Sequence, residues 1–321
     1  MNRQHHLLPL IGLTLAMLFW GSSFIALKLA FASYPPWLVI FGRMFIGALC
    51  FLPLVGHFRK IRFRRQDIKY LLLMAAFEPC LYFIFEAWAL QNTTASQAGM
   101  ITAMLPLMVA VGAAFWLHER IGRITWLGFV LAIAGAWWLG LSGEPSAGAP
   151  NPLFGNFLEF IAMVCATGYT ITLKHLSARY SPLFLTALQA FVGSVFFLFP
   201  ALFAPGDMLP VEPTLISTLA IVYLGTVVTV GAYGLYNFGV SRIPATQAGA
   251  FVNLIPVFSV ILGFAILGER FSTQQFLAAG LVFIGVLISQ LGGAGRGSKP
   301  LPVAVSATPL PNNDTVRQNE G

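Results

Sequence analysis

Charged side chains are scarce in this sequence, and their scarcity excludes most classes of protein. Asp, Glu, Lys and Arg make up 9% of the 321 residues, whereas 57% are hydrophobic. Soluble domains carry about 25% charged residues, so a water-soluble globule is excluded. The apolar stretches run for about 20 residues, the length of a transmembrane helix. They lack the alternation of apolar and polar residues that is typical of a transmembrane β-barrel. We therefore expect an all-α integral membrane protein.

The sequence also has little that would suit a metal site or an enzyme. Its three cysteines, Cys50, Cys80 and Cys165, lie in apolar stretches without CxxC spacing, which predicts neither a disulfide framework nor a zinc site. The five histidines fall in tails, loops or expected helix ends, and no GxxxxGKS or GxxxxGKT phosphate loop occurs. We expect no metal, no cofactor and no enzymatic activity. The net charge of +7 is attributed to membrane topology rather than to nucleic-acid binding.

Ten apolar runs predict ten transmembrane helices. They cover roughly residues 8–30, 37–55, 68–89, 95–117, 124–142, 156–176, 182–203, 215–239, 245–267 and 272–291. An even number of crossings places both termini on one side of the membrane. Beyond residue 291 the composition shifts to Gly, Pro, Ser and Asn, which predicts a disordered tail.

An internal repeat is the most informative pattern in the chain. A shift of 150 residues superposes scarce residue types on identical ones, namely Gln97, Pro106, Glu119 and Arg120 on Gln247, Pro256, Glu269 and Arg270. A shift of 146 residues pairs Lys28, Tyr34 and Pro36 with Lys174, Tyr180 and Pro182. The chain is thus predicted to hold two five-helix repeats, at residues 1–143 and 152–291, followed by a tail at residues 292–321.

The odd number of helices in each repeat decides how the repeats are related. Because the second copy begins on the opposite side of the membrane, the two repeats have inverted topology. Inverted repeats around a central site are the usual architecture of secondary transporters. Channels and membrane enzymes can also be duplicated, but transport is the favoured interpretation.

Several segments resemble a known family. Residues 20–24 (WGSSF) with Lys28, residues 95–106 (ASQAGMITAMLP), and residues 267–270 (LGER) resemble the EamA domain of the drug/metabolite transporter superfamily. The first copy of the last motif departs from the pattern, because His118 replaces its glycine. The resemblance implies ten helices around a central cavity, exchange or proton coupling, and no ATP hydrolysis. Members export amino acids, sugars, nucleotides and other metabolites.

Ionisable residues inside the expected helices are the first candidates for a site. Arg43, Glu78 and Glu86 each lie within an apolar run, where a charge is costly unless it faces a cavity or a partner. Glu78, Tyr82 and Glu86 are spaced at i, i+4 and i+8, which predicts one helix face with the carboxylates ~12 Å apart. We expect Arg43 between the two carboxylates in depth and near Glu78, so that separation of Arg43 and Glu78 lets Glu78 take up a proton. Glu86 is then the exit or a second partner of Arg43. The structural alternative is an ion pair that only joins two helices.

Deep aromatic and polar residues form a second set of candidates. Trp20, Tyr169, Tyr233 and Asn237 lie well inside the expected helices. Such residues can line a pocket for a planar or amphipathic solute. Packing between helices is the alternative role for each of them.

Prolines within the expected helices are hinge candidates. Pro106 and Pro256 occupy equivalent repeat positions, and Pro79 follows Glu78 directly. Each removes a backbone hydrogen bond and kinks its helix, and freed carbonyls at membrane depth need protein or cavity water. The alternative is a packing kink with no cavity.

Other charged residues lie near the expected helix ends. Lys28, Lys174 and Glu159 are expected to reach the membrane interface with their long side chains. Glu119 and Glu269 recur in both repeats and are expected to shape helix–loop junctions rather than touch a substrate.

These patterns together predict a secondary transporter that exports or exchanges a small metabolite, such as an amino acid, by alternating access. Protons are the candidate coupling ion. The alternatives are a duplicated membrane bundle with a regulatory or biogenesis role, and an ion channel.

The distribution of basic residues predicts the orientation in a plasma or inner membrane. With both termini in the cytoplasm, 15 of the 18 Lys and Arg residues lie in cytoplasmic loops or ends, as the positive-inside rule requires. Arg270 is the exception among the loops.

We predict that residues 56–69 face the cytoplasm and that residues 142–153 face the other side. In intact cells, a membrane-impermeant thiol reagent should label Ser146→Cys but not Arg64→Cys in a chain without other cysteines. Labelling of Arg64→Cys without permeabilisation would contradict the orientation.

Overall fold

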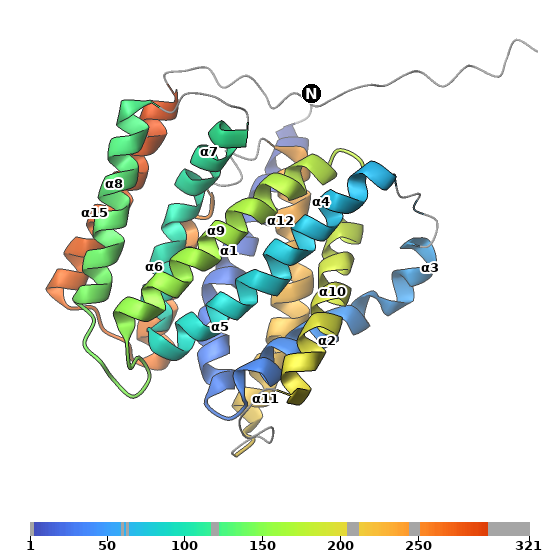
Figure 1. Cartoon of the computed structure of the whole chain (residues 1–321). Helices are drawn as coiled ribbons and strands as arrows, with labels where there is room; N and C mark the ends of the chain where they lie inside the picture. Colours follow the sequence, from blue (N-terminus) through green and yellow to red (C-terminus); the bar gives the residue numbers. More distant parts are fainter. Residues whose placement is uncertain are drawn as a thin grey trace, which may run out of the picture.

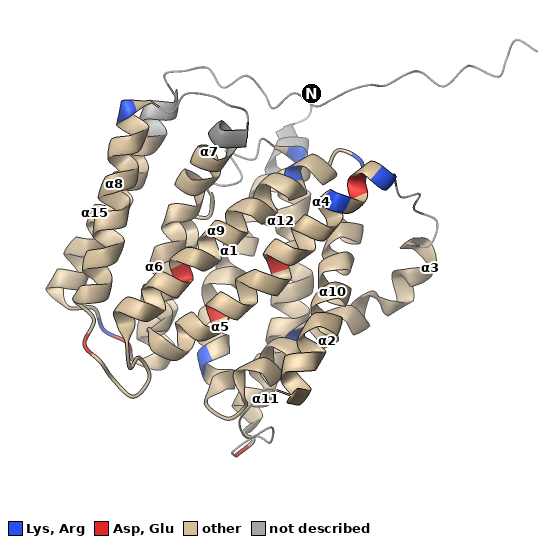
Figure 2. Ribbon diagram, in the orientation of Figure 1, with Lys and Arg blue, Asp and Glu red and all other residues tan. Residues whose placement is uncertain are grey.

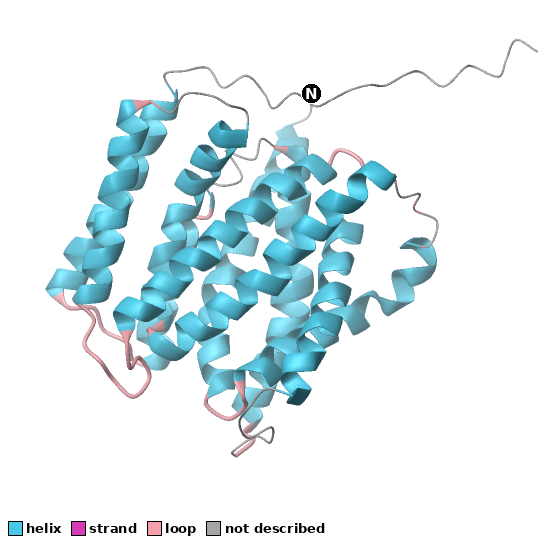
Figure 3. Ribbon diagram, viewed as in Figure 1, coloured by secondary structure: helices cyan, strands magenta, loops and turns pink. Residues whose placement is uncertain are grey.

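The structure is a computed structural model of the whole chain, and it describes residues 3–58, 61, 64–116, 122–203, 212–243 and 251–294. Within these ranges the chain is built from helices, and no strand is present (Figure 3). The expectation of an all-α membrane fold is confirmed. The expected tail at residues 292–321 lies almost wholly outside the described residues.

The helices follow one another with short connections (Figure 1). In the first repeat they are α1 (Arg3–Phe31), α2 (Pro36–Phe51), α3 (Val55–Phe58), α4 (Arg65–Ala75), α5 (Tyr82–Asn92), α6 (Ala95–Ile101), α7 (Leu105–Trp116) and α8 (Arg123–Leu141). In the second repeat they are α9 (Pro152–Leu176), α10 (Pro182–Phe203), α11 (Leu215–Tyr223), α12 (Tyr233–Arg242), α14 (Leu254–Leu262) and α15 (Thr273–Ala294).

The lengths of these helices suit a bilayer. Among the described residues, eight helical spans are long and apolar enough to cross a membrane, and two shorter apolar helices cover Leu254–Leu267 and Thr273–Ser289. Many large apolar side chains are exposed on the outside of the bundle, for example Leu215, Phe203 and Phe199. Such a surface is matched to lipid rather than to water.

The two ends of the bundle differ in charge. Most of the coloured Lys and Arg residues lie at the end where α1 begins and α15 finishes (Figure 2). The loop that follows α8, residues 142–151, lies at the opposite end (Figure 1). We call that opposite end the outer end, after the orientation that the sequence predicts.

Helix interruptions occur at equivalent positions of the two repeats. A π-helical segment, Ala76–Leu81, joins α4 to α5, and another, Leu224–Ala232, joins α11 to α12. A 3₁₀ turn, Thr102–Met104, separates α6 from α7, and a turn at residues 252–253 precedes α14. A shift of 150 residues brings each interruption onto its counterpart. Discontinuous helices in matching halves are typical of transporter folds and mark their central site.

Small residues hold the last helices of the two repeats together. Gly128 and Gly135 of α8 face α15, and Gly285 of α15 faces α8. A Cβ atom at Gly135 would lie 2.7 Å from the backbone nitrogen of Val282 and 2.9 Å from the carbonyl oxygen of Ala278. Backbones that approach this closely leave no room for a side chain, as is common where membrane helices associate.

Gly135→Val should therefore destabilise the bundle by about 1–3 kcal/mol through overpacking, measured as a lower Tm of the purified protein in detergent. Gly280→Ala is the matched control, because a Cβ atom at Gly280 meets nothing within 4 Å. Equal Tm values for the two variants would contradict the close α8–α15 contact.

Candidate functional site

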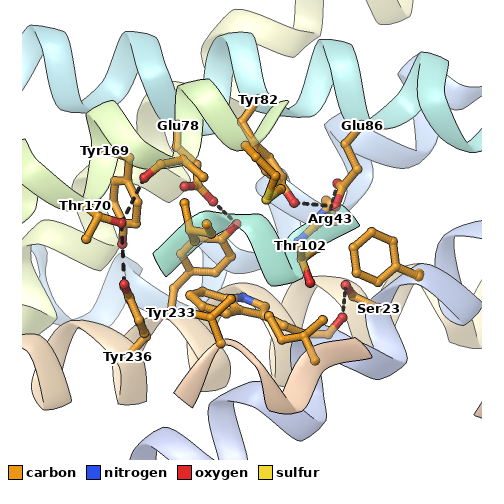
Figure 4. A pocket seen from close by; sticks show the side chains of 17 residues that line it. Ser23, Arg43, Glu78, Tyr82, Glu86, Thr102, Tyr169, Thr170, Tyr233 and Tyr236 are labelled. Carbon is orange, nitrogen blue, oxygen red and sulfur yellow. Dashed lines mark hydrogen bonds and ion pairs between the residues drawn. The ribbon is translucent and has the colours of Figure 1, made fainter. Parts of the chain in front are cut away.

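A cavity lies at the centre of the bundle, between helices of both repeats (Figure 4). Its volume is about 40 Å³, room for about one water molecule, so the cavity is nearly closed in this conformation. Seven of the eight residues expected from the sequence line it: Trp20, Arg43, Glu78, Tyr82, Glu86, Tyr169 and Tyr233. Ten further residues line it: Ser23, Phe24, Thr102, Leu105, Met163, Ala166, Thr170, Tyr236, Val252 and Ile255.

Arg43 of α2 is the positive charge of the cavity. Its side chain is 2% exposed, and its NH1 nitrogen lies 3.6 Å from Oε2 of Glu86. Arg43 Nε also donates to Thr229 Oγ1 at 3.5 Å, and the guanidinium lies 4.2 Å from the ring centre of Phe83, in cation–π geometry. Tyr82 donates to Glu86 Oε1 at 3.0 Å. The Arg43–Glu86 pair is thus held from three helical segments.

The ion pair of Arg43 is formed with the second of the two carboxylates that the sequence offered. Its ion pair is with Glu86, while Glu78 instead accepts a hydrogen bond from the hydroxyl of Tyr233 in the second repeat. The sequence could not distinguish the two carboxylates, because Arg43 is expected at a membrane depth between those of Glu78 and Glu86.

The helical alignment expected for Glu78 is also wrong. Glu78 has φ −149° and ψ 119°, an extended conformation at the point where the helix breaks before Pro79. Its carboxylate is therefore not in register with Tyr82 and Glu86 on α5, although all three reach the cavity (Figure 4). A break before proline is expected physically, because proline disfavours a helical conformation in the preceding residue.

Asn237 does not line the cavity but supports it from behind. It is fully buried and accepts from the hydroxyl of Tyr169 at 2.5 Å. Its amide donates to Thr186 at 2.8 Å and to Gln189 at 3.3 Å. Asn237 thus fixes the direction of the Tyr169 ring.

The other two proline positions begin helical segments next to the cavity. Pro106 is the second residue of α7 and Pro256 is the third residue of α14. The missing N–H of proline costs little in a first turn, so the interruption lies just before each proline rather than at it. Leu105 and Ile255, the residues that precede the prolines, line the cavity. A hinge role for these positions stays a prediction.

The basic residues near helix ends bind backbone carbonyls. Lys174 donates to the carbonyls of Val240 and Ile243 at 2.7 and 3.0 Å, at the end of α12. Lys28 donates to the carbonyl of Gly148 in the outer loop at 2.5 Å. The ammonium group of Lys174 thus complements carbonyls at the C-terminal end of α12, where a cation is favourable, whereas Lys28 binds a loop carbonyl.

Glu269 joins the two repeats at the outer end. Its carboxylate accepts from the backbone nitrogens of Ala95 and Ser96 at 2.9 and 2.8 Å, in the first turn of α6. Gly268, with φ 67°, ends the preceding helix in the left-handed region that favours glycine. Glu119 and His118, the equivalent residues of the first repeat, lie outside the described residues.

Glu159 departs most from expectation. It was expected to reach the membrane interface, yet it is 0% exposed. Neither of its carboxylate oxygens has a hydrogen-bond partner among the described residues. Glu159 lies in the first third of α9, which suggested a place near the membrane interface. The position of a residue along a helix does not reveal which neighbouring helices cover its side chain.

Polar atoms without partners also occur on the cavity wall. Trp20 Nε1, Arg43 NH1 and Glu86 Oε2 are buried and make no hydrogen bond among the described residues. Buried polar groups normally have partners, so these atoms are available to a bound molecule. Two donors and one acceptor thus face one cavity. Within the described ranges, no cluster of His, Cys, Asp and Glu suits a metal ion.

Comparison with known proteins identifies the family. The model of the EamA-like transporter family matches residues 7–141 and, a second time, residues 153–291. The chain belongs to the EamA-like transporter family. This is a family within the drug/metabolite transporter superfamily, so the expected family is confirmed and the chain is a multi-pass membrane transporter.

Named relatives of this EamA-like chain are also transporters. It is 30% identical to the uncharacterized transporter YetK of Bacillus subtilis over 87% of this chain and 86% of the relative. It is 26% identical to the uncharacterized inner membrane transporter YedA of Escherichia coli, over 94% of this chain and 97% of the relative. A "Probable terminal-alkyne amino-acid exporter" of Streptantibioticus cattleyicolor is 24% identical, over 89% and 94%. A crystal structure with 22% identity covers 90% of this chain and 98% of its own, with a TM-score of 0.59, and so shares the fold.

The ion pair in the cavity makes a stability prediction. Arg43→Gln should lower the free energy of unfolding by about 3 kcal/mol, because it leaves Glu86 buried without its counter-charge. Adding Glu86→Gln should restore most of the loss, as measured by Tm in detergent. Arg43→Gln with Glu78→Gln is the matched control. If that control recovered stability equally well, the Arg43–Glu86 pairing would be contradicted.

Proposed function

We propose that this EamA-like transporter exports or exchanges an amino acid or a related small solute by alternating access, coupled to protons. The observation that carries the proposal is the central cavity, where both repeats contribute residues beside matching helix interruptions. One family relative named as an amino-acid exporter is consistent with this substrate class.

The chemistry of the cavity wall suits a zwitterion with an apolar or aromatic part. Trp20 Nε1 and Arg43 NH1 are donors that make no hydrogen bond among the described residues, and they are suited to a carboxylate. Glu86 Oε2, the ion-pair partner of Arg43, likewise accepts no hydrogen bond there and is suited to an ammonium group. Trp20 packs against the rings of Tyr233 and Tyr236 at centroid distances of 5.1 and 4.7 Å. These rings offer a stacking surface for the remainder of the solute.

Glu78 is the proposed coupling carboxylate. It lies at a helix break, is buried, and its described side-chain partner is a neutral hydroxyl, that of Tyr233. A carboxylate that has no cationic partner in an apolar protein is costly when ionised. Glu78 is therefore suited to carry a proton in one conformation and to release it in another.

Alternating access requires the repeats to separate at one end at a time. At the outer end, Glu269 of the second repeat holds the first turn of α6, and we propose that this contact opens in the outward-facing state. The interruptions at Pro79, Pro106 and Pro256 lie beside the cavity and are the proposed hinges of that motion.

The test is transport by purified protein in proteoliposomes, with a radiolabelled mixture of the common L-amino acids. We expect saturable counterflow, and accumulation when a pH gradient is imposed. Current without counterflow would support a channel instead, and neither activity would support a non-transporting bundle. Metabolite profiles of medium from overexpressing and deleted cells would then identify the solute.

Glu78→Gln should reduce pH-gradient-driven accumulation to the level reached without a pH gradient while counterflow continues, because glutamine fills the same space but carries no exchangeable proton. Glu212→Gln, at an exposed loop carboxylate, is the matched control and should behave like the wild type. Full pH-driven accumulation by Glu78→Gln would remove Glu78 from the coupling mechanism.

A further inference from the structure

A buried carboxylate joins the two repeats at the inner end, the end of the bundle where α1 and α4 begin (Figure 1). Asp67 lies in the first turn of α4 and is 1% exposed. Arg179 NH1 donates to Asp67 Oδ1 at 2.5 Å, and Tyr180 donates to Asp67 Oδ2 at 3.1 Å. Both donors belong to the turn between α9 and α10, in the second repeat. We call Asp67, Arg179 and Tyr180 the inner contact.

The outer end has a similar contact that is built from hydroxyl groups. Ser217 lies in the first turn of α11, and its Oγ is 2.9 Å from Ser33 Oγ. Ser217 also donates to the carbonyl of Leu29 at 2.8 Å. The hydroxyls of Tyr34 and Thr218 share a hydrogen bond of 2.7 Å. We call Ser33, Tyr34, Ser217 and Thr218 the outer contact.

The symmetry of the repeats maps one contact onto the other. A shift of 150 residues places Asp67 on Ser217, and a shift of 146 residues places Tyr34 on Tyr180. The turn before α10 binds the start of α4, and the turn before α2 binds the start of α11. The two contacts are therefore an inverted pair, one ionic and one neutral, at opposite ends of the bundle.

Each contact holds one end of a short helix whose other end breaks beside the cavity. Helix α4 runs into the break at Ala76–Leu81, and α11 runs into the break at Leu224–Ala232. The two breaks meet in the cavity, because Tyr233, the first residue after the second break, donates to the carboxylate of Glu78 in the first. Helices bend most readily at π-helical segments. Helices α4 and α11 are therefore arms that are held at the membrane surface and can bend at the cavity.

We propose that the inner contact is a latch that opens to admit the solute from the cytoplasm, and that the outer contact is its counterpart on the other side. The proposal rests on the proposed function, because alternating access requires the two ends to open in turn. When Arg179 and Tyr180 release Asp67, the start of α4 moves away from the turn before α10. Charge-assisted hydrogen bonds are roughly twice as strong as neutral ones. In the solute-free protein, α4 is therefore held more firmly than α11.

Spin labels measure the opening of the two contacts separately, in lipid nanodiscs and without any solute. Gln66 and Ala178 are exposed beside the inner contact. Ile216 and Ala32 are their repeat equivalents beside the outer contact and are also exposed. Each pair is replaced by cysteines in a chain whose native cysteines are changed to serine, and double electron–electron resonance gives the distances. Long distances should be rarer at the inner pair than at the outer pair, and the reverse order would overturn the proposal.

Removal of the charge tests the latch itself. Asp67→Asn should raise the fraction of long distances at the inner pair about tenfold, as expected for the loss of hydrogen bonds to a charged group, while the outer pair does not lengthen. Arg65→Gln, which removes an exposed charge from the same turn of α4, is the matched control and should behave like the wild type. Unchanged inner distances in Asp67→Asn, or equal lengthening in Arg65→Gln, would overturn the latch. If Asp67→Asn fails to fold, Arg179→Gln removes the same ion pair from its 30% exposed side and should lengthen the inner pair in the same way.

An exchange of chemistry between the ends provides a second test. Asp67→Ser with Arg179→Ser gives the inner contact the hydroxyls of its outer counterpart, so the inner pair should become as broadly distributed as the outer pair. A distribution as narrow as in the wild type would show that the ion pair does not hold the arm.

Counterflow of the amino-acid mixture in proteoliposomes distinguishes the two proposals. A wild type that transports, but whose inner distances do not respond to Asp67→Asn, would overturn the latch alone. A wild type whose distances respond as expected, but which moves no solute, would contradict the proposed function alone.

Discussion

The high cost of ionised groups in an apolar bundle is the constraint on which this structure depends. Only a few acidic or basic side chains lie in the interior of the described part, and most of them have a particular partner, Glu159 being the exception. Arg43 pairs with Glu86, Glu78 receives the hydroxyl of Tyr233, and Glu269 accepts two backbone N–H groups. Removal of one member leaves the other exposed to that cost. In the proposed mechanism, a ligand that competes for Arg43 therefore links the binding of solute to the movement of protons.

Pseudo-symmetry explains where the backbone is irregular. Broken helices at membrane depth are tolerated only where protein or a cavity satisfies the freed groups, and here the breaks surround the cavity from both repeats. The charges are not symmetric, however, because the residue equivalent to Glu78 is Val228 and the equivalent of Glu86 is Tyr236. The second repeat instead supplies hydroxyls and rings, so each half contributes a different part of one site.

The amino-acid sequence predicts the helical fold, the inverted repeat and seven of the cavity residues. These features can be read from the length of the apolar runs, from the repeated motifs, and from the rare charged and aromatic residues inside those runs. It does not predict contacts that depend on how helices rotate. The partner of Arg43, the extended conformation of Glu78 and the place of Asn237 behind Tyr169 all follow from packing between distant segments. Glu159 shows the same limit, since a position near the start of α9 suggests the interface, whereas the residue is fully buried in a helix that packs against α5.

Separation of the repeats at the outer end is the central claim of the proposed mechanism, and a reversible cross-link tests it most directly. Ser96 and Gly263 approach each other there, because a Cβ atom at Gly263 would overlap the hydroxyl of Ser96. A double variant, Ser96→Cys with Gly263→Cys, in a chain whose Cys50, Cys80 and Cys165 are replaced by serine, should form a disulfide on oxidation. Counterflow in proteoliposomes should then stop and return on reduction. Undiminished counterflow by the fully cross-linked protein would contradict alternating access through this end.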